Sequence, residues 1–131
     1  MSRSESFARL SERVCREQLW ELLPGGVLVP LPGGRSQLID MERYELGDQE
    51  RVRLWARIGT VETLGASRME VALRKNADLE RGAFAIREEM LVMTETFALD
   101  EMGANEFEGA VRFLAATADG YEEVIYGTDD Y

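Results

Sequence analysis

The segment RVRLWARIG, residues 51–59, alternates between two kinds of side chain, and this alternation restricts the fold more than any other feature. Successive side chains of an extended chain point to opposite faces, so an alternating segment predicts a strand with one face on a hydrophobic core. The apolar face consists of Val52, Leu54, Ala56 and Ile58. The opposite face consists of Arg51, Arg53, Trp55 and Arg57. The chain is therefore expected to build a sheet around this strand.

The chain has 131 residues, of which 45% are hydrophobic, and this size and composition predict one globular domain. We place the domain at residues 1–126 and expect residues 127–131 to form a flexible acidic tail. Cys15 is the only cysteine, so no internal disulfide can form, which fits a reducing compartment. No apolar run reaches the length of a membrane span, and the N-terminal residues lack the pattern of a secretory signal. We therefore expect a cytoplasmic protein.

The charge is strongly negative and unevenly distributed along the chain. The formal net charge is −10, and residues 99–131 carry nine acidic side chains against one base, Arg112. Such a balance argues against non-specific binding to DNA or RNA, which depends on neutralising phosphates, and against binding to anionic membranes. A general role of the acidic residues in solubility is the simpler interpretation of the charge. We therefore expect neither nucleic acid nor a membrane among the partners.

Three segments have the apolar spacing of helices. Residues 4–23 carry a stripe at helical intervals, and the Pro-Gly-Gly sequence at 24–26 is expected to end this helix. Residues 66–79 form a second, shorter candidate. The last helix has the clearest pattern, with steps of three and four, and Asn105 is its candidate N-cap. The stripe of this helix consists of Phe107, Val111, Leu114, Ala118, Tyr121 and Ile125.

Five segments have the pattern of strands. They are residues 27–31, 37–46, 51–58, 83–88 and 90–99. A meander of three strands followed by a separate hairpin implies a mostly antiparallel sheet. The predicted order is therefore α-β-β-β-α-β-β-α, an α+β fold in which the first and last helices pack on one face of a twisted sheet.

The chain lacks the residues on which most catalytic and metal sites depend. There is no histidine, which removes the commonest general base and the most frequent zinc ligand. Cys15 lies beside the apolar stripe of the first helix and is expected to be a core residue rather than a nucleophile. The glycine pairs form no phosphate- or dinucleotide-binding motif, and the acids of 99–108 lack the spacing of a calcium loop. We therefore predict that the protein is not an enzyme and has no catalytic residues, no cofactor and no metal site.

Two interpretations account for the polar face of residues 51–58. In the first, Asp40 and Glu42 of the preceding strand form cross-strand pairs with the arginines. Tyr44 would then lie near Trp55. In the second, another subunit or a bound peptide covers Trp55, because tryptophan and arginine are favoured at interfaces.

Some strands are apolar on both faces. Residues 90–97 and residues 27–31 place apolar or uncharged side chains on each side of the extended chain. A sheet that helices cover on one face should have a polar second face, so such strands indicate that something covers the second side. The six methionines either fill the core or form an adaptable binding surface.

The order of elements, the length and the charge together resemble the class I type III secretion chaperones, the family that includes the Tir chaperone. The segment VRLWARIGTVE looks like the third strand of that family. The segment MEVALRKNADLERGAFAIREEMLVMTETFAL is similar to its short helix, with Leu73 and Asn76, and the following hairpin. The segment EFEGAVRFLAATADGYEEVI looks like its last helix.

This resemblance implies a non-catalytic homodimer that holds the N-terminal region of a secreted effector in an extended state. It places the two-fold contact on the second helix and the strands beside it. The implied dimer residues are Val61, Leu64, Met69 and Leu73. It also implies that cargo side chains enter shallow apolar grooves and that a cargo strand can add to a sheet edge. The candidate partner-binding residues are Leu10, Val14, Leu28, Val29 and Leu31, together with Trp55.

Three functions remain open from the sequence. The first is the dimeric chaperone, the second is a regulatory or signalling adaptor with the same fold, and the third is a small-molecule enzyme or sensor. Open apolar grooves on a two-fold dimer would favour the first, and a deep polar pocket with converging carboxylates would favour the third. The identity of the bound protein would separate the first from the second.

Overall fold

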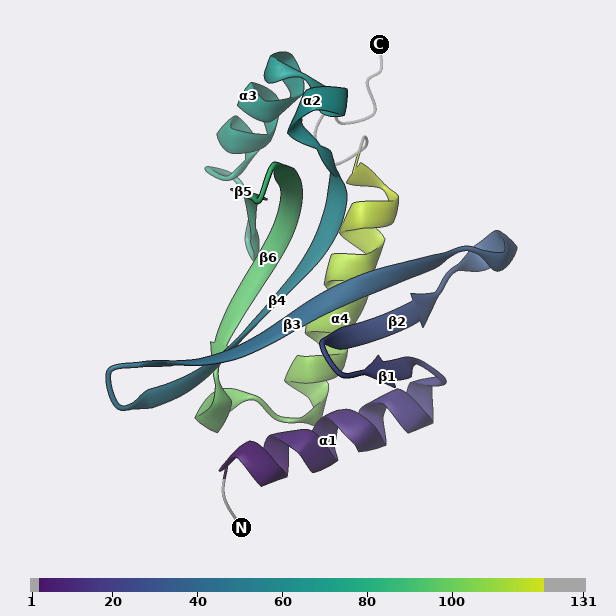
Figure 1. The fold of residues 1–131 in the computed structure, drawn as a ribbon, viewed down its shortest axis with the longest axis vertical. Coiled ribbons are helices and arrows are strands. Elements are labelled where there is room, and N and C mark those ends of the chain that lie inside the picture. The colour runs from purple at the N-terminus through teal and green to yellow at the C-terminus, as the bar shows by residue number, and fades with distance from the viewer. Residues whose placement is uncertain (1–2, 122–131) are drawn as a thin grey trace.

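The computed structural model describes residues 3–121, with side chains from Ser6 onward, and shows a six-stranded antiparallel sheet (Figure 1). The helices are α1 (Arg3–Gln18), α2 (Val61–Leu64), α3 (Ala66–Lys75) and α4 (Ala104–Asp119). The strands are β1 (Glu21–Leu23), β2 (Gly26–Pro30), β3 (Ser36–Leu46), β4 (Gln49–Thr60), β5 (Ala83–Arg87) and β6 (Met90–Ala98). Two short 3-10 turns are η1 (Pro32–Gly34) and η2 (Leu99–Glu101). The sheet order β1-β2-β3-β4-β6-β5 makes β1 and β5 the edge strands.

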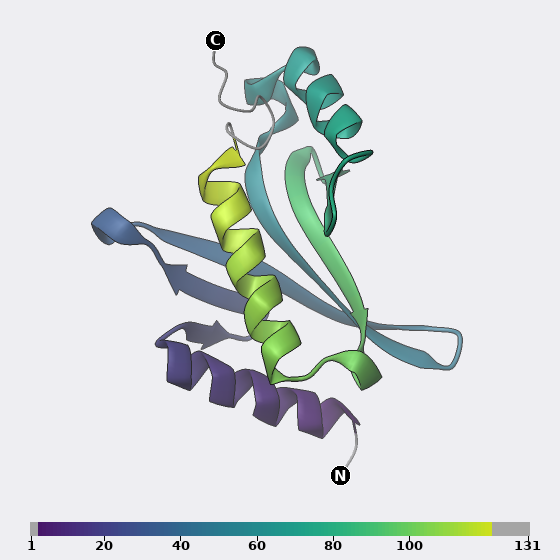
Figure 2. The same ribbon diagram turned by 180° about the vertical axis from the view of Figure 1, so that it is seen from behind.

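The predicted α+β fold, with the first and last helices on one face of the sheet, is confirmed. Figure 2 shows α4 running across the sheet, with α1 lying across its lower end. The opposite face of the sheet bears no helix in the described range (Figure 1). No described helix is both long and apolar enough to cross a bilayer.

The core forms where α4 meets the inner face of the long central strands. The predicted apolar face of β4 is fully buried at Val52, Leu54 and Ala56. The fully buried residues of α4 are Phe107, Ala110, Val111 and Leu114. Phe7 of α1 meets Phe107 edge to face, with the ring centroids 5.7 Å apart, so the two helices share one core.

The first helix ends earlier than the sequence predicted. It stops at Gln18 instead of continuing to residue 23, and the next residues form β1, which the sequence analysis missed. Pro24 and Gly25 are therefore the turn between β1 and β2 and do not end a helix. Leu22 and Leu23 continued the apolar pattern of the helix, which hid the strand.

A Schellman-type turn closes α1. The Trp20 N–H donates to the Cys15 carbonyl at 2.9 Å and the Leu19 N–H donates to the Arg16 carbonyl at 3.4 Å. This turn holds Leu19 at a φ of 63°, a left-handed conformation that glycine adopts at lower cost than leucine. Leu19 is also 81% exposed, the highest value among the exposed large apolar residues that the structure describes.

Two other helix boundaries differ from the prediction. The predicted helix 66–79 is α3, which ends at Lys75, and a short helix that the sequence did not predict, α2, precedes it; Gly65, whose φ is +88°, separates the two. The N-cap of α4 is Gly103 rather than Asn105, because the Glu106 side chain accepts a hydrogen bond from the Gly103 N–H at 3.0 Å. The predicted stripe residue Ile125, the domain end at residue 126 and the tail 127–131 lie outside the described residues.

Two arginine–carboxylate pairs fasten loops to the core. Arg81, before β5, donates two hydrogen bonds to the buried Glu95 of β6, at 2.9 and 2.8 Å, and lies 4.7 Å from the Phe113 ring. Arg35, after η1, bonds to Asp119 in the last turn of α4, where it offsets an acid at the negative end of a helix. Hydrogen bonds to these carboxylates raise the pKa of both guanidinium groups.

Asn76 closes part of the β5 edge. Its side-chain amide donates to the Phe84 carbonyl at 3.0 Å and accepts from the Phe84 N–H at 2.7 Å, as a neighbouring strand would. The turn from β5 to β6 is the predicted Glu88-Glu89 pair, with both residues at positive φ. One amide therefore blocks the middle of an otherwise open edge.

We predict that Leu19→Gly raises the free energy of unfolding by about 1 kcal/mol, because glycine removes the cost of the left-handed conformation. Urea denaturation followed by circular dichroism measures this change. Leu19→Ala is the matched control: it removes the same exposed side chain but keeps the backbone cost, so its stability should stay within about 0.5 kcal/mol of the parent. Equal stabilities for Leu19→Gly and Leu19→Ala would contradict the assignment of strain to Leu19.

Candidate protein-binding surfaces

The outer face of the sheet carries a network of cross-strand ion pairs. Asp40 of β3 accepts two hydrogen bonds from Arg57 of β4, at 2.8 and 3.0 Å, and is largely buried. Glu42 of β3 pairs with Arg53 at 3.2 Å and with Arg87 of β5 at 3.3 Å. This confirms the first interpretation of the arginine face, in which acids on the preceding strand pair with arginines.

Trp55 is covered from within the chain. The Arg87 guanidinium lies 3.9 Å from the centroid of the Trp55 ring, which leaves the tryptophan half-buried. Tyr44, expected near Trp55, instead accepts a hydrogen bond from Arg53 at 3.0 Å. Beside Trp55 lies a hollow of about 210 Å³, whose lining residues are Trp55, Arg57, Arg87, Glu88, Met90 and Val92. Trp55 is therefore partly covered without another molecule, and the rest of its ring remains accessible.

Three half-buried leucines form an apolar area on the same outer face, here called the leucine patch: Leu23 of β1, Leu28 of β2 and Leu38 of β3. Leu28 lies directly opposite Leu38 in the β2–β3 register, and Leu23 lies opposite Gly26, two residues before Leu28. Residues that face each other across antiparallel strands share one side of the sheet. The leucine patch thus spans three strands where no helix covers them.

The structure divides the predicted partner-binding residues into two groups. Val14 and Val29 are 2% and 7% exposed and belong to the core, so they have no surface to offer a partner. Leu10, Leu28 and Leu31 are half-buried, on α1, on β2 and directly after β2. Val29 was predicted with Leu28 because both belong to one apolar strand, but adjacent residues of a strand face opposite sides. Leu19, Leu23 and Leu38 were not predicted, although the alternation of 37–46 placed Leu38 on the polar face.

The predicted dimer residues divide in the same way. Leu64 and Met69 are buried within the chain, Val61 is half-buried, and Leu73 of α3 is 56% exposed. Ile86 of the adjoining strand β5 is 52% exposed and was not predicted. Leu73 and Ile86 are here called the α3–β5 apolar pair. They are the apolar side chains that this end of the molecule leaves in water.

The described residues contain no group of three histidine, cysteine or acidic side chains placed to hold a metal. Cys15 is 3% exposed, and burial raises the pKa of its thiol above the ordinary value of 9.0. A buried thiol of this kind is a poor nucleophile. The prediction that Cys15 is a core residue is confirmed.

Comparison with known proteins finds likeness in structure. No protein-family model and no curated protein sequence matches the chain. A chain in the structure of the ExsC–ExsE complex has a TM-score of 0.67 and 16% identity, covering 95% of this chain and 97% of that one. A chain in the HopA1–SchA chaperone–effector complex has a TM-score of 0.61 and 9% identity, covering 89% and 93%.

A third match is to the structure of the Yersinia pestis type III secretion chaperone SycH with a stable fragment of YscM2, with a TM-score of 0.54 and 13% identity, covering 85% of this chain and 95% of that chain. The chain has the fold of a type III secretion chaperone. At these identities the likeness concerns the fold, and it confirms at that level the resemblance seen in the sequence. Because nearly the whole of each matched chain is covered, the shared unit is the entire domain.

We predict that Cys15 of the native protein reacts with a thiol reagent at mildly alkaline pH at least about tenfold more slowly than Cys15 of the unfolded protein. Absorbance after addition of an aromatic disulfide, with and without denaturant, measures this ratio. The raised pKa also means that burial of the thiol stabilises the fold fully below about pH 9 and less above it, since the unfolded chain ionises first. Equal labelling rates in the two states would show that Cys15 is accessible.

Proposed function

We propose that this protein is a non-catalytic, dimeric chaperone of the cytoplasm that binds an extended segment of a partner protein, such as a secreted effector, before export. The observation that supports this most is the match of nearly the whole chain to structures of a chaperone–effector complex and of a type III secretion chaperone. A regulatory or signalling adaptor with the same fold is the alternative.

The exposed apolar residues provide the surface that this function requires. The leucine patch lies on the uncovered face of the sheet, and Leu10 and Leu31 lie half-buried on neighbouring elements. Full burial of one leucine side chain contributes about 1.5–3 kcal/mol, so several partly exposed leucines can together hold a partner segment. Shallow apolar contacts of this kind suit an extended chain better than a small molecule.

Strand addition at the β1 and β5 edges can contribute little to the binding. The β1 edge is three residues long, and the middle of the β5 edge is occupied by Asn76. An added strand would therefore form few backbone hydrogen bonds at either edge. Side-chain contacts at the leucine patch are the main source of affinity in this proposal.

The α3–β5 apolar pair supports a two-fold contact. Leu73 and Ile86 come from adjoining elements and are more than half exposed, and the half-buried Val61 lies on α2, which adjoins α3. A symmetric dimer uses the same patch on both subunits, so a single apolar area is sufficient. The absence of histidine and the burial of Cys15 support a role without catalysis.

We predict that light scattering at micromolar concentration gives about twice the mass of one chain and that Leu73→Glu lowers this mass towards that of a monomer. A carboxylate at the centre of an apolar contact would lose hydration without gaining a partner. Leu46→Glu is the matched control, because Leu46 is similarly exposed but lies at the distant β3–β4 turn. A monomer at every concentration, or an equal effect of Leu46→Glu, would refute this interface.

We predict that the product of the adjacent gene, co-expressed with this protein, co-purifies with it and that Leu28→Glu lowers the recovered amount by about tenfold, equivalent to about 1.4 kcal/mol. Circular dichroism would establish that the variant is folded, and Leu46→Glu again serves as control. Limited proteolysis of the bound partner separates the two functions: rapid cleavage at many sites indicates an extended cargo, whereas a resistant, folded partner indicates the adaptor.

A further inference from the structure

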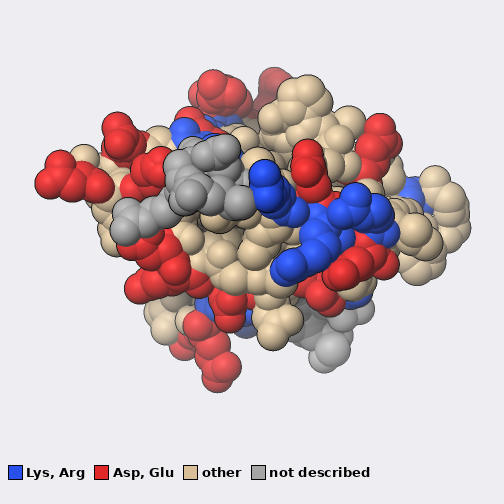
Figure 3. All heavy atoms as spheres, turned by 90° about the horizontal axis from the view of Figure 1, so that it is seen from below, with Lys and Arg blue, Asp and Glu red and all other residues tan. Residues whose placement is uncertain are grey.

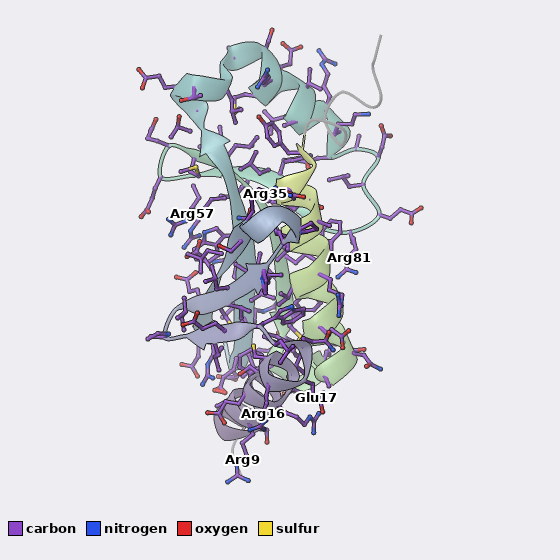
Figure 4. The ribbon with its side chains drawn as sticks, turned by 90° about the vertical axis from the view of Figure 1, so that its right-hand side faces the viewer. Arg9, Arg16, Glu17, Arg35, Arg57 and Arg81 are labelled. Carbon is purple, nitrogen blue, oxygen red and sulfur yellow. The ribbon has the colours of Figure 1, made fainter. Side chains whose placement is uncertain are left out.

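The exposed surface of α1 carries a row of three arginines, here called the arginine row: Arg9, Arg13 and Arg16. Steps of four and three residues place side chains on one face of a helix. All three are exposed, and none forms an ion pair or hydrogen bond with any side chain among residues 6–121. Figure 4 shows Arg9 extending away from the body of the molecule, with Arg16 on the same helix.

The arginine row differs from most other arginines that the structure describes in this acidic protein. Arg53, Arg57, Arg74, Arg81 and Arg112 each bond to a carboxylate of the chain itself. Seen from below, the side on which α1 lies, basic side chains gather in one place among scattered acidic ones (Figure 3). The chain has 25 acidic side chains against 15 basic ones, so acids to pair with the row are not lacking. With no carboxylate partner among residues 6–121, the row can meet carboxylates from another molecule.

The arginine row lies along a shallow, open surface of α1. The residues of this surface are Ser6, Arg9, Leu10, Glu12, Arg13 and Arg16. Guanidinium groups bind carboxylates with two parallel hydrogen bonds, and the half-buried Leu10 adds an apolar contact beside them. A surface with these side chains suits a polypeptide that carries both carboxylates and apolar side chains.

We propose that the arginine row docks an extended acidic segment of the partner protein, with Asp or Glu at alternate positions. This rests on the proposed function, because the segment would belong to the same partner. Four residues of a helix rise about 6.0 Å, and alternate residues of an extended chain are about 6.6 Å apart. Alternate carboxylates of an extended segment therefore match the spacing from Arg9 to Arg13.

A peptide fits this surface better than a membrane or a nucleic acid. The arginine row is only about 10 Å long, seven residues at 1.5 Å each, and Glu12 and Glu17 are exposed on the same helix. An extended polyanion would bring further phosphates against these acids and against a net charge of −10. A short acidic segment can place its carboxylates on the three arginines, although Glu12 lies on the same surface.

The test uses the purified full chain and a fluorescent nine-residue peptide with glutamate and serine at alternating positions, and a twin peptide with glutamine in place of glutamate. Fluorescence anisotropy should show that the glutamate peptide binds at least about tenfold more tightly than its twin and that its affinity falls as salt is raised. Arg9→Gln/Arg13→Gln should weaken binding at least about fivefold. The matched pair Arg74→Gln/Lys75→Gln, with the same change of charge on α3, should change it less than about twofold.

Equal affinity for the two peptides, or equal losses in the two double variants, would overturn the proposal, because binding would then not depend on the arginine row. A second experiment measures binding of the parent protein to vesicles of phosphatidylcholine and phosphatidylglycerol. If the protein binds these vesicles but not the glutamate peptide, and Arg9→Gln/Arg13→Gln no longer binds the vesicles, the proposal is overturned in favour of a membrane. The peptide experiment needs neither the cargo nor the dimer. If the protein co-purifies with its cargo but does not bind the glutamate peptide, only this inference is refuted and the proposed function stands.

Discussion

The contact between α4 and the inner face of β3, β4 and β6 is the interaction on which the rest of the molecule depends. Its residues are the most completely buried of the chain, and α1 joins the same core through Phe7 and Phe107. Because both long helices lie on this side, the sheet is covered once and not twice. Every exposed apolar residue of the outer face follows from this one-sided arrangement.

The outer face of the sheet has two areas that differ in how their side chains are covered. Over β3, β4 and β5, charged pairs and the stacking of Arg87 on Trp55 give Asp40, Glu42, Arg57 and Arg87 partners inside the chain. Over β1, β2 and β3, the leucine patch has no such cover. Net stability gains from surface ion pairs are small, so the first area is better understood as balancing its charges within one chain and the second as arranged to be covered.

Periodicity predicted the parts of this fold that depend on one segment alone. The alternation of 51–59 gave both faces of β4 correctly, and steps of three and four located α4. Periodicity failed at the end of α1, where the left-handed conformation of Leu19 ends the helix. Nothing in the sequence distinguishes this turn from a continuing helix. Periodicity failed also at Val14 and Val29, because the direction in which an apolar residue faces depends on the final packing. That the arginine row has no side-chain partner among residues 6–121 could not be predicted either, since pairing depends on neighbours brought by the fold.

The closure of the β5 edge by Asn76 affects how such a molecule binds aggregation-prone polypeptides. A sheet with a long open edge can add one extended chain after another as new strands and so nucleate a fibril. Here the β1 edge is three residues long and the β5 edge is interrupted by an amide. At these two edges the molecule offers an unfolded guest few backbone groups on which a further strand could grow.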